Sequence, residues 1–87
     1  MAKEGTINVY DLGIVFGRSA ALAAKMDYAD VLKTAETEDD LLDVISYYLE
    51  HDVVIMRLIL PDEVVSVFKD GWINSFYDII FPLRHLA

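Results

Sequence analysis

Hydrophobic and polar positions follow a helical period along most of the chain, and the longest apolar stretch runs from Ile7 to Met26. Its three charged residues lie seven positions apart, close to two helical turns, so they share one narrow stripe. The other sides are apolar or small, and a helix of this kind is usually buried by several neighbours or by a second chain. The pattern therefore predicts a first helix around which the rest of the chain packs. Residues 6–10 also have the composition of a short strand, which remains the alternative there.

Small residues form a seam along another side of this helix. Gly13 and Gly17 each lower its helix propensity by about 1 kcal/mol relative to alanine. Such a loss is offset where another helix approaches closely, so we expect both glycines to lie at a helix contact used for association. Thr6 or Asn8 has a suitable side chain to cap the helix. The seam continues through Ala20, Ala21 and Ala24.

Further helices are predicted in the middle of the chain. Residues 28–35 fit a short helix, and the polar stretch after it fits a turn. Thr37, followed three residues later by Asp40, resembles a capping box with Asp in place of Glu or Gln. An apolar stripe follows, with acidic and aromatic residues on the opposite side. The stripe is Leu41, Leu42, Ile45, Tyr48 and Leu49, and the opposite side is Asp39, Asp43, Tyr47 and Glu50.

Residues 53–60 are the most ambiguous segment. Val53, Met56 and Leu60 continue the helical spacing across His51, and no Gly or Pro interrupts the chain before Pro61. The same segment is rich in β-branched residues and fits a buried strand as well. A strand would have to pair with residues 6–10, and an isolated pair is only marginally stable. We therefore favour a long helix, or two helices meeting near His51.

The C-terminal third predicts two more helices. Pro61, followed by two acidic residues, fits a helix start. Gly71 is placed to end that helix in the left-handed conformation, and a last helix is expected over residues 72–81 before Pro82. The sequence thus predicts an all-α fold, with residues 1–87 forming a single compact bundle of five to six short and medium helices. The alternative is an α+β fold with a strand pair from residues 6–10 and 53–60.

The composition favours association. The chain has 87 residues, of which 55% are hydrophobic, compared with about 45–50% in a typical globular protein. A domain of this size has little interior volume, so the excess of apolar side chains indicates a surface buried against a partner or a second copy. A compact, well-filled monomer is the alternative interpretation.

The net charge of −8 is concentrated in the middle of the chain. Nine of the 15 acidic residues lie between Asp27 and Asp52, together with a single base, Lys33. Because the chain has no cluster of Lys and Arg, we expect no direct binding to nucleic acid. The acidic residues could form a solvated surface, a docking surface for a basic partner, or a mimic of nucleic-acid phosphates. We define this acidic face as Glu36, Glu38, Asp39, Asp40, Asp43 and Glu50.

Nothing in the sequence indicates a secreted or membrane protein. The chain has no cysteine, which excludes disulfides and cysteine chemistry. Its N-terminus lacks the basic and apolar regions of a signal peptide, and no apolar run approaches the roughly 20 residues that span a bilayer. We therefore expect a soluble, cytoplasmic protein without a membrane partner.

Catalytic and metal-binding patterns are also lacking. His51 and His85 are far apart in sequence, and neither belongs to a known metal-ligand motif. Glu50, His51 and Asp52 are consecutive, and consecutive residues on a helix diverge by about 100° and do not chelate one ion. Neither a phosphate-binding glycine loop nor a nucleophile elbow is found. We expect a protein that is not an enzyme and has no cofactor.

These patterns predict a protein–protein interaction module, either a homo-oligomer or a small helical subunit of a larger assembly. The aromatic stripe of the last predicted helix fits core packing or a partner contact, since Trp, Tyr and Arg are enriched at interface hot spots. The alternative function is an acidic inhibitor, a nucleic-acid mimic that binds a basic nucleic-acid-handling partner through the acidic face. The predicted partner-binding residues are Gly13, Gly17, Trp72, Phe76, Tyr77, Phe81 and Arg84.

Overall fold

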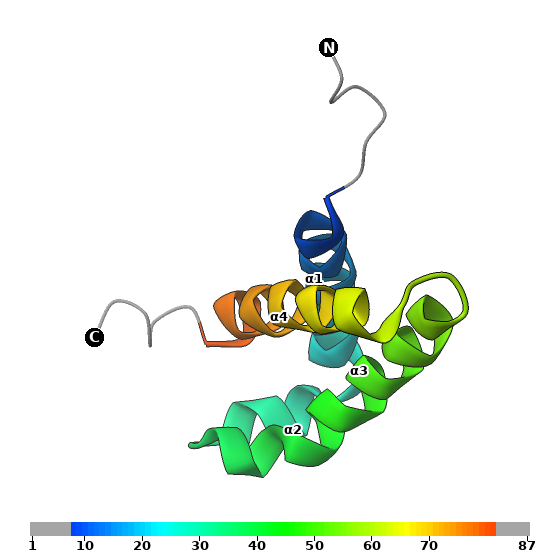
Figure 1. The fold of residues 1–87 in the computed structure, drawn as a ribbon. Coiled ribbons are helices and arrows are strands. Elements are labelled where there is room, and N and C mark those ends of the chain that lie inside the picture. Colours follow the sequence, from blue (N-terminus) through cyan, green and yellow to red (C-terminus); the bar gives the residue numbers. More distant parts are fainter. Residues whose placement is uncertain (1–7, 82–87) are drawn as a thin grey trace.

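The computed structural model describes residues 8–81, and within that range the chain is helical with no strand. The all-α prediction is confirmed, and the alternative of a strand pair is wrong for the described residues 8–10 and 53–60. The described range holds four α-helices and one 3₁₀ helix, whereas five to six helices were predicted. The helices are α1 (Val9–Asp27), α2 (Ala29–Thr34), η1 (Glu38–Leu41), α3 (Leu42–Arg57) and α4 (Asp62–Ile80), arranged as in Figure 1.

Helix α1 begins at Val9, two residues after the predicted start, and Asn8, one of the two candidate caps, precedes it. The Asn8 side chain accepts a hydrogen bond of 2.8 Å from the backbone N–H of Tyr10, which satisfies one of the unpaired N–H groups of the first turn. The helix ends at Asp27, one residue beyond the predicted end. Thr6, the other candidate cap, lies outside the described residues.

The predicted helix break at Gly71 is wrong, because α4 runs without interruption from Asp62 to Ile80. Gly71 is buried in the middle of the helix, facing α1. A Cβ atom there would collide with the Tyr10 carbonyl oxygen and lie 3.2 Å from the Ile14 backbone nitrogen. The residue is glycine because another backbone passes against it, and no left-handed turn is needed.

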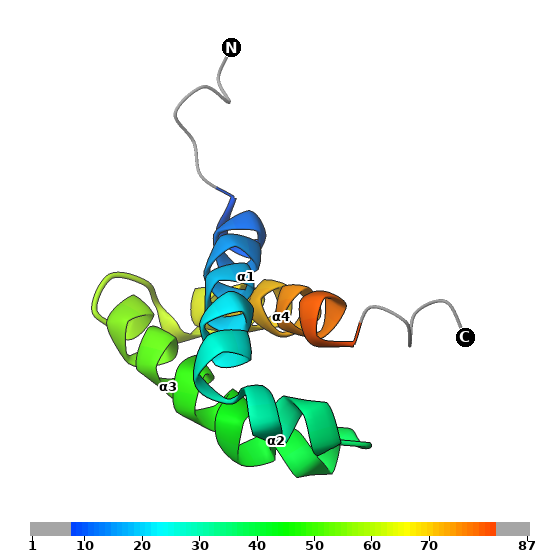
Figure 2. The ribbon, with the colours of Figure 1, turned by 180° about the vertical axis from the view of Figure 1, so that it is seen from behind.

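Two glycines of α1 complete this close approach. A Cβ on Gly13 would collide with the Phe68 carbonyl oxygen, and one on Gly17 would collide with the Trp72 carbonyl oxygen. Gly13 and Gly17 are four residues apart and therefore share one face of α1. The backbones of α1 and α4 thus cross in direct contact, and both views of the ribbon show this steep crossing (Figures 1 and 2).

Large aromatic side chains fill the space beside the crossing. Trp72 and Phe76 stack with ring centroids 5.0 Å apart, and Phe16 meets Phe68 edge to face at 5.6 Å. Rings of this size each bury about 150–250 Å² and dominate the stability of a small core. The buried hydrophobic residues are Ala20, Ala21, Ala24, Leu41, Val44, Ile45, Val53, Met56, Val65, Phe68, Trp72 and Phe76.

The predicted capping box at the start of the third helical segment is confirmed. The Asp40 carboxylate accepts hydrogen bonds from the backbone N–H groups of Glu36 at 2.8 Å and Thr37 at 3.1 Å. These two bonds stabilise the charged form and lower the pKa of Asp40 below its ordinary value. The box precedes the short η1 helix, so α3 begins at Leu42.

Helix α3 passes through His51 without a break, as the helical spacing predicted. Its inner face packs against α1 and α4 through residues that continue that spacing, including Ile45, Val53 and Met56. Leu42 was expected on this face, but 51% of its surface is exposed. Its neighbour Leu41, the last residue of η1, is fully buried in the core.

We expect Gly13→Ala to lower the free energy of unfolding by about 1–3 kcal/mol, because the added methyl forces α1 and α4 apart. At an open helical position the same change would raise stability by about 1 kcal/mol, so the sign of the effect is diagnostic. Urea denaturation followed by circular dichroism gives the value, with Ser19→Ala on the exposed side of α1 as the control. A Gly13→Ala protein as stable as the parent would contradict the close crossing.

Candidate interaction surface

Four of the predicted partner-binding residues lie inside the chain's own core. Gly13 and Gly17 are buried against the backbone of α4. Trp72 and Phe76 have no exposed surface. The prediction of a close helix contact at the glycines is correct, but the helix that approaches belongs to the same chain. These four residues therefore do not present a surface to a partner, which corrects the predicted association site.

The other predicted contact residues lie at the end of α4. Tyr77 and Phe81 are half-buried and meet edge to face with ring centroids 5.9 Å apart. Both also border the core, so the aromatic stripe is mainly part of the fold. Arg84 lies outside the described residues. A role for Tyr77, Phe81 or Arg84 in partner binding stays a prediction.

The acidic face is divided between a structural and an exposed part. Asp40 is occupied by the capping box, and Glu36 takes part in the same turn through its backbone N–H. Asp39, Asp43 and Glu50 are exposed, and the last two lie on the same side of α3, seven residues apart. Glu38 begins η1. Binding of a basic partner by these residues stays a prediction.

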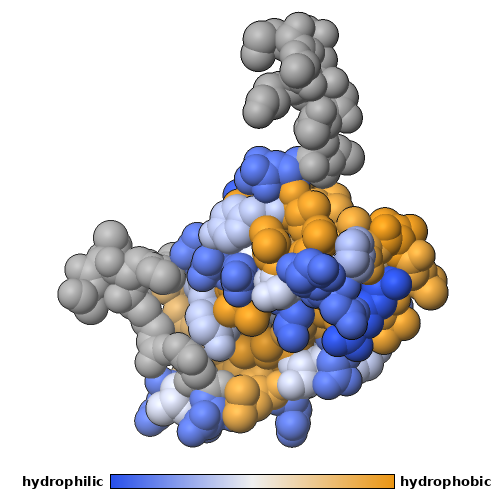
Figure 3. Space-filling model, viewed as in Figure 1, coloured by the Kyte–Doolittle hydropathy of each residue, from blue (hydrophilic) through white to orange (hydrophobic). Residues whose placement is uncertain are grey.

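The structure reveals an apolar surface that the sequence analysis did not single out. We call it the apolar tip, and it consists of Val54, Ile55, Leu58 and Ile59, which are 59%, 40%, 80% and 68% exposed. It lies at the C-terminal end of α3 and in the turn toward α4. Figure 3 shows hydrophobic colour over this turn, at the right of the view. Single exposed apolar residues are common, but four of them within six positions form a continuous candidate contact surface.

The apolar tip is exposed because α3 ends there and the chain reverses. The backbone N–H groups of Leu58 and Ile59 bond to the carbonyl oxygens of Ile55 and Met56 at 3.1 and 3.0 Å, which closes the turn. Only Leu60 returns to the core. Val53 and Met56 mark the buried side of this end of α3, and the four tip residues do not lie on that side. This helical spacing is the sequence signal that could have identified the apolar tip.

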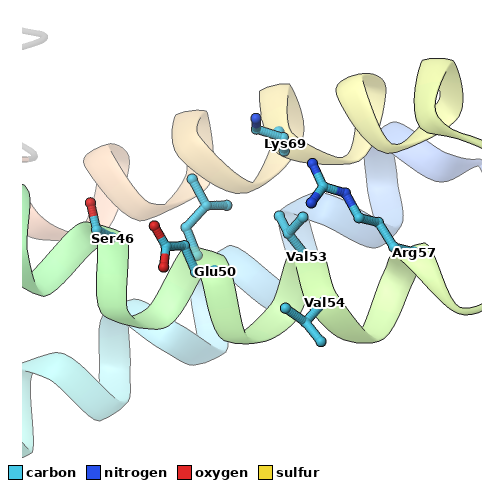
Figure 4. A pocket seen from close by; sticks show the side chains of 7 residues that line it. Ser46, Glu50, Val53, Val54, Arg57 and Lys69 are labelled. Carbon is cyan, nitrogen blue, oxygen red and sulfur yellow. The ribbon is translucent and has the colours of Figure 1, made fainter.

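A groove of about 360 Å³ lies beside the apolar tip, between α3 and α4. Its floor is apolar, and charged side chains stand along its rims (Figure 4). Arg57 extends toward Lys69 of α4, and Glu50 lies further along α3 toward its N-terminus. Two basic groups thus converge in an otherwise acidic chain. The groove is lined by Ser46, Leu49, Glu50, Val53, Val54, Arg57 and Lys69.

Two polar contacts hold α3 in place. The indole N–H of the buried Trp72 donates to a carboxylate oxygen of Asp52 at 2.8 Å. The hydroxyl of Tyr48 donates to a carboxylate oxygen of Asp27 at 3.0 Å. Burial and this bond to a negative group together raise the pKa of Tyr48 to about 12. Both contacts join helices to one another, which is a structural role.

The described residues offer no arrangement suited to metal chemistry. Between residues 8 and 81, no three His, Cys, Asp or Glu side chains gather where they could hold a metal ion. His51 is exposed on α3, and His85 lies outside the described residues. In the same part of the chain, no helix combines the length and hydrophobicity that a membrane span requires.

Comparisons with models of known protein families, with curated proteins and with solved structures found no match to this chain. The candidate site therefore rests on exposure and charge: an apolar tip on α3, flanked by the rims of the α3–α4 groove.

We expect Asp52→Ala to lower the free energy of unfolding by about 1–3 kcal/mol, because it leaves the buried Trp72 N–H without an acceptor. Asp52→Asn keeps a carbonyl oxygen at that place and should lose less. Urea denaturation monitored by tryptophan fluorescence compares the two variants. Equal losses for Ala and Asn would show that the hydrogen bond contributes nothing.

Tyr48 should make stability depend on pH in the alkaline range. The folded chain holds the Tyr48 proton up to about pH 12, whereas the unfolded chain loses it near pH 10. The unfolded state therefore binds fewer protons between these values, and the free energy of unfolding falls as the pH rises through that window. Urea denaturation from pH 9 to about 12 should show a smaller fall in Tyr48→Phe. Tyr47→Phe, which changes the more exposed neighbouring ring, serves as the control, and an unchanged slope in Tyr48→Phe would refute the assignment.

Proposed function

We propose that this protein is a helical protein–protein interaction module whose contact surface is the apolar tip together with the outer face of α3. The observation that carries the proposal is the exposure of Leu58 and Ile59, at 80% and 68%, beside the exposed Val54. The core does not use these side chains, although buried positions in the adjoining helix α3 are also aliphatic. A partner that covered Leu58 and Ile59 would remove these apolar side chains from water.

The energetic argument follows from area. Burying an aliphatic side chain of this size against a partner is worth about 1.5–3 kcal/mol. Leu58 and Val54 lie four residues apart and therefore line one side of α3, so a single partner surface can cover both. The charged groove rims beside them supply polar groups around an apolar centre, which is the usual anatomy of an interface.

This proposal covers a homo-oligomer and a small subunit of a larger assembly. The competing proposal, an acidic inhibitor that mimics nucleic acid, is supported by the exposure of Asp39, Asp43 and Glu50. That mode of binding would depend on charge, and it would weaken steeply with salt. The apolar tip would play no part in it.

The test compares Leu58→Ser with Met26→Ser, a matched change at an equally exposed position on α1, where Met26 is 83% exposed. Tagged variants are crosslinked in the cells that express the protein, and the crosslinked proteins, including self-crosslinks, are quantified by mass spectrometry. We expect Leu58→Ser to reduce a specific crosslinked species by about tenfold, the loss that follows from one aliphatic contact. Met26→Ser should leave that species unchanged.

A double variant, Asp39→Asn with Asp43→Asn, tests the acidic alternative in the same experiment. If this variant loses the species and Leu58→Ser keeps it, the acidic face is the contact surface. If Leu58→Ser and Met26→Ser give the same pattern as the parent, the apolar tip is not a contact surface.

A further inference from the structure

The outer face of α3 has a self-complementary pattern of charge. Glu50 and Arg57 are opposite in charge and seven residues apart, so they lie on one side of the helix, roughly 10.5 Å apart along its axis. Val54 is 59% exposed and lies between them. Neither Glu50 nor Arg57 forms an ion pair with another described residue. Within residues 8–81, both charges are therefore exposed and not engaged in an ion pair.

We propose that a second copy of this chain docks on this face, with its α3 antiparallel to the first. A two-fold axis between residues 53 and 54 places Glu50 opposite the partner's Arg57 and, by the same symmetry, Arg57 opposite the partner's Glu50. The same axis brings Val54 against the partner's Val54. The same helix surface on the two copies thus forms two reciprocal Glu50–Arg57 ion pairs around an apolar centre.

The rims of the α3–α4 groove strengthen this match. Arg57 extends toward Lys69 (Figure 4), and both line the groove beside the apolar tip. The partner's Glu50 would therefore meet two positive groups instead of one. In a chain with a net charge of −8, a local pair of cations beside an exposed apolar row favours an acidic group on whatever docks there.

Apolar residues extend the contact on both sides of the axis. Tyr47 is 64% exposed and Leu58 is 80% exposed. Tyr47 lies about two helical turns before Val54 and Leu58 about one turn after it, so all three share one exposed side of α3. In the antiparallel arrangement, Tyr47 of one copy comes within about two residues of the partner's Leu58 along the axis. The apolar row supplies affinity, and the ion pairs fix the register, because exposed ion pairs alone contribute little.

The distribution of acidic residues selects the antiparallel orientation. Asp43 lies in the first turn of α3, and Asp39 and Asp40 lie in η1 just before it. In a parallel pair these residues would face their counterparts directly. In the antiparallel pair Asp43 and the partner's Asp43 are separated by roughly 30 Å along the axis, which is several times the Debye length of about 8–10 Å at physiological salt.

This inference rests on the proposed function, because it names the occupant of the same surface. The test is sedimentation equilibrium of the purified chain over a dilution series, for the parent and for Glu50→Arg, Arg57→Glu and the double variant. We expect the parent to dimerise and each single reversal to weaken dimerisation about tenfold or more, since symmetry places like charges together twice. The double variant exchanges the two charges and should recover most of that loss, although Lys69 then lies beside the partner's new arginine and keeps it below the parent.

Two further variants make the outcome decisive. Arg18→Glu reverses an exposed charge on α1 and should leave the dimer unchanged, and circular dichroism shows whether each variant keeps its helices. A parent that is monomeric at every concentration, single reversals without effect, or a double variant that fails to recover would each overturn the antiparallel dimer. If reversals have no effect but Leu58→Ser still abolishes a larger species, the proposed interaction module stands and only this docking geometry fails.

Discussion

The close crossing of α1 and α4 is the constraint on which the rest of the structure depends. Gly13, Gly17 and Gly71 remove side chains at the points where the two backbones meet. Because the helices touch there, the rings of Trp72 and Phe76 can be covered completely beside the crossing. A domain of this size has few other sources of stability, so three glycines determine where its aromatic core can form.

The position of helix α3 depends on the surface of α1 and α4 that their crossing leaves uncovered. Its inner residues pack against α1 and α4, and Asp52 accepts the indole N–H of the buried Trp72. This fixes the rotation of α3 about its own axis. The rotation in turn decides that Val54 and Leu58 face water, whereas Val53 and Met56 are covered. The exposure of the candidate contact surface on α3 thus follows from how α1 and α4 pack against each other.

Local signals in the sequence predicted much of this fold. Asn8 at the start of α1, the Thr37–Asp40 capping box and the unbroken spacing through His51 act between near neighbours, and each is found in the structure. Gly71 was misjudged, because glycine suits both a helix end and a close crossing, and only the position of α1 distinguishes them. Trp72 and Phe76, which are buried in the core, were assigned to a partner contact for a related reason: an aromatic stripe looks the same in a core as at an interface.

The crossing joins elements from opposite ends of the described chain, since Gly13 and Gly71 are separated by more than fifty residues in sequence. The entropy cost of closing so long a loop must be met before the contact contributes any stability. We therefore expect the core to form more slowly than the individual helices. During synthesis, Gly13 and Gly17 lack the backbone that packs against them until α4 has left the ribosome. The order of elements along the chain therefore makes completion of this core wait for α4.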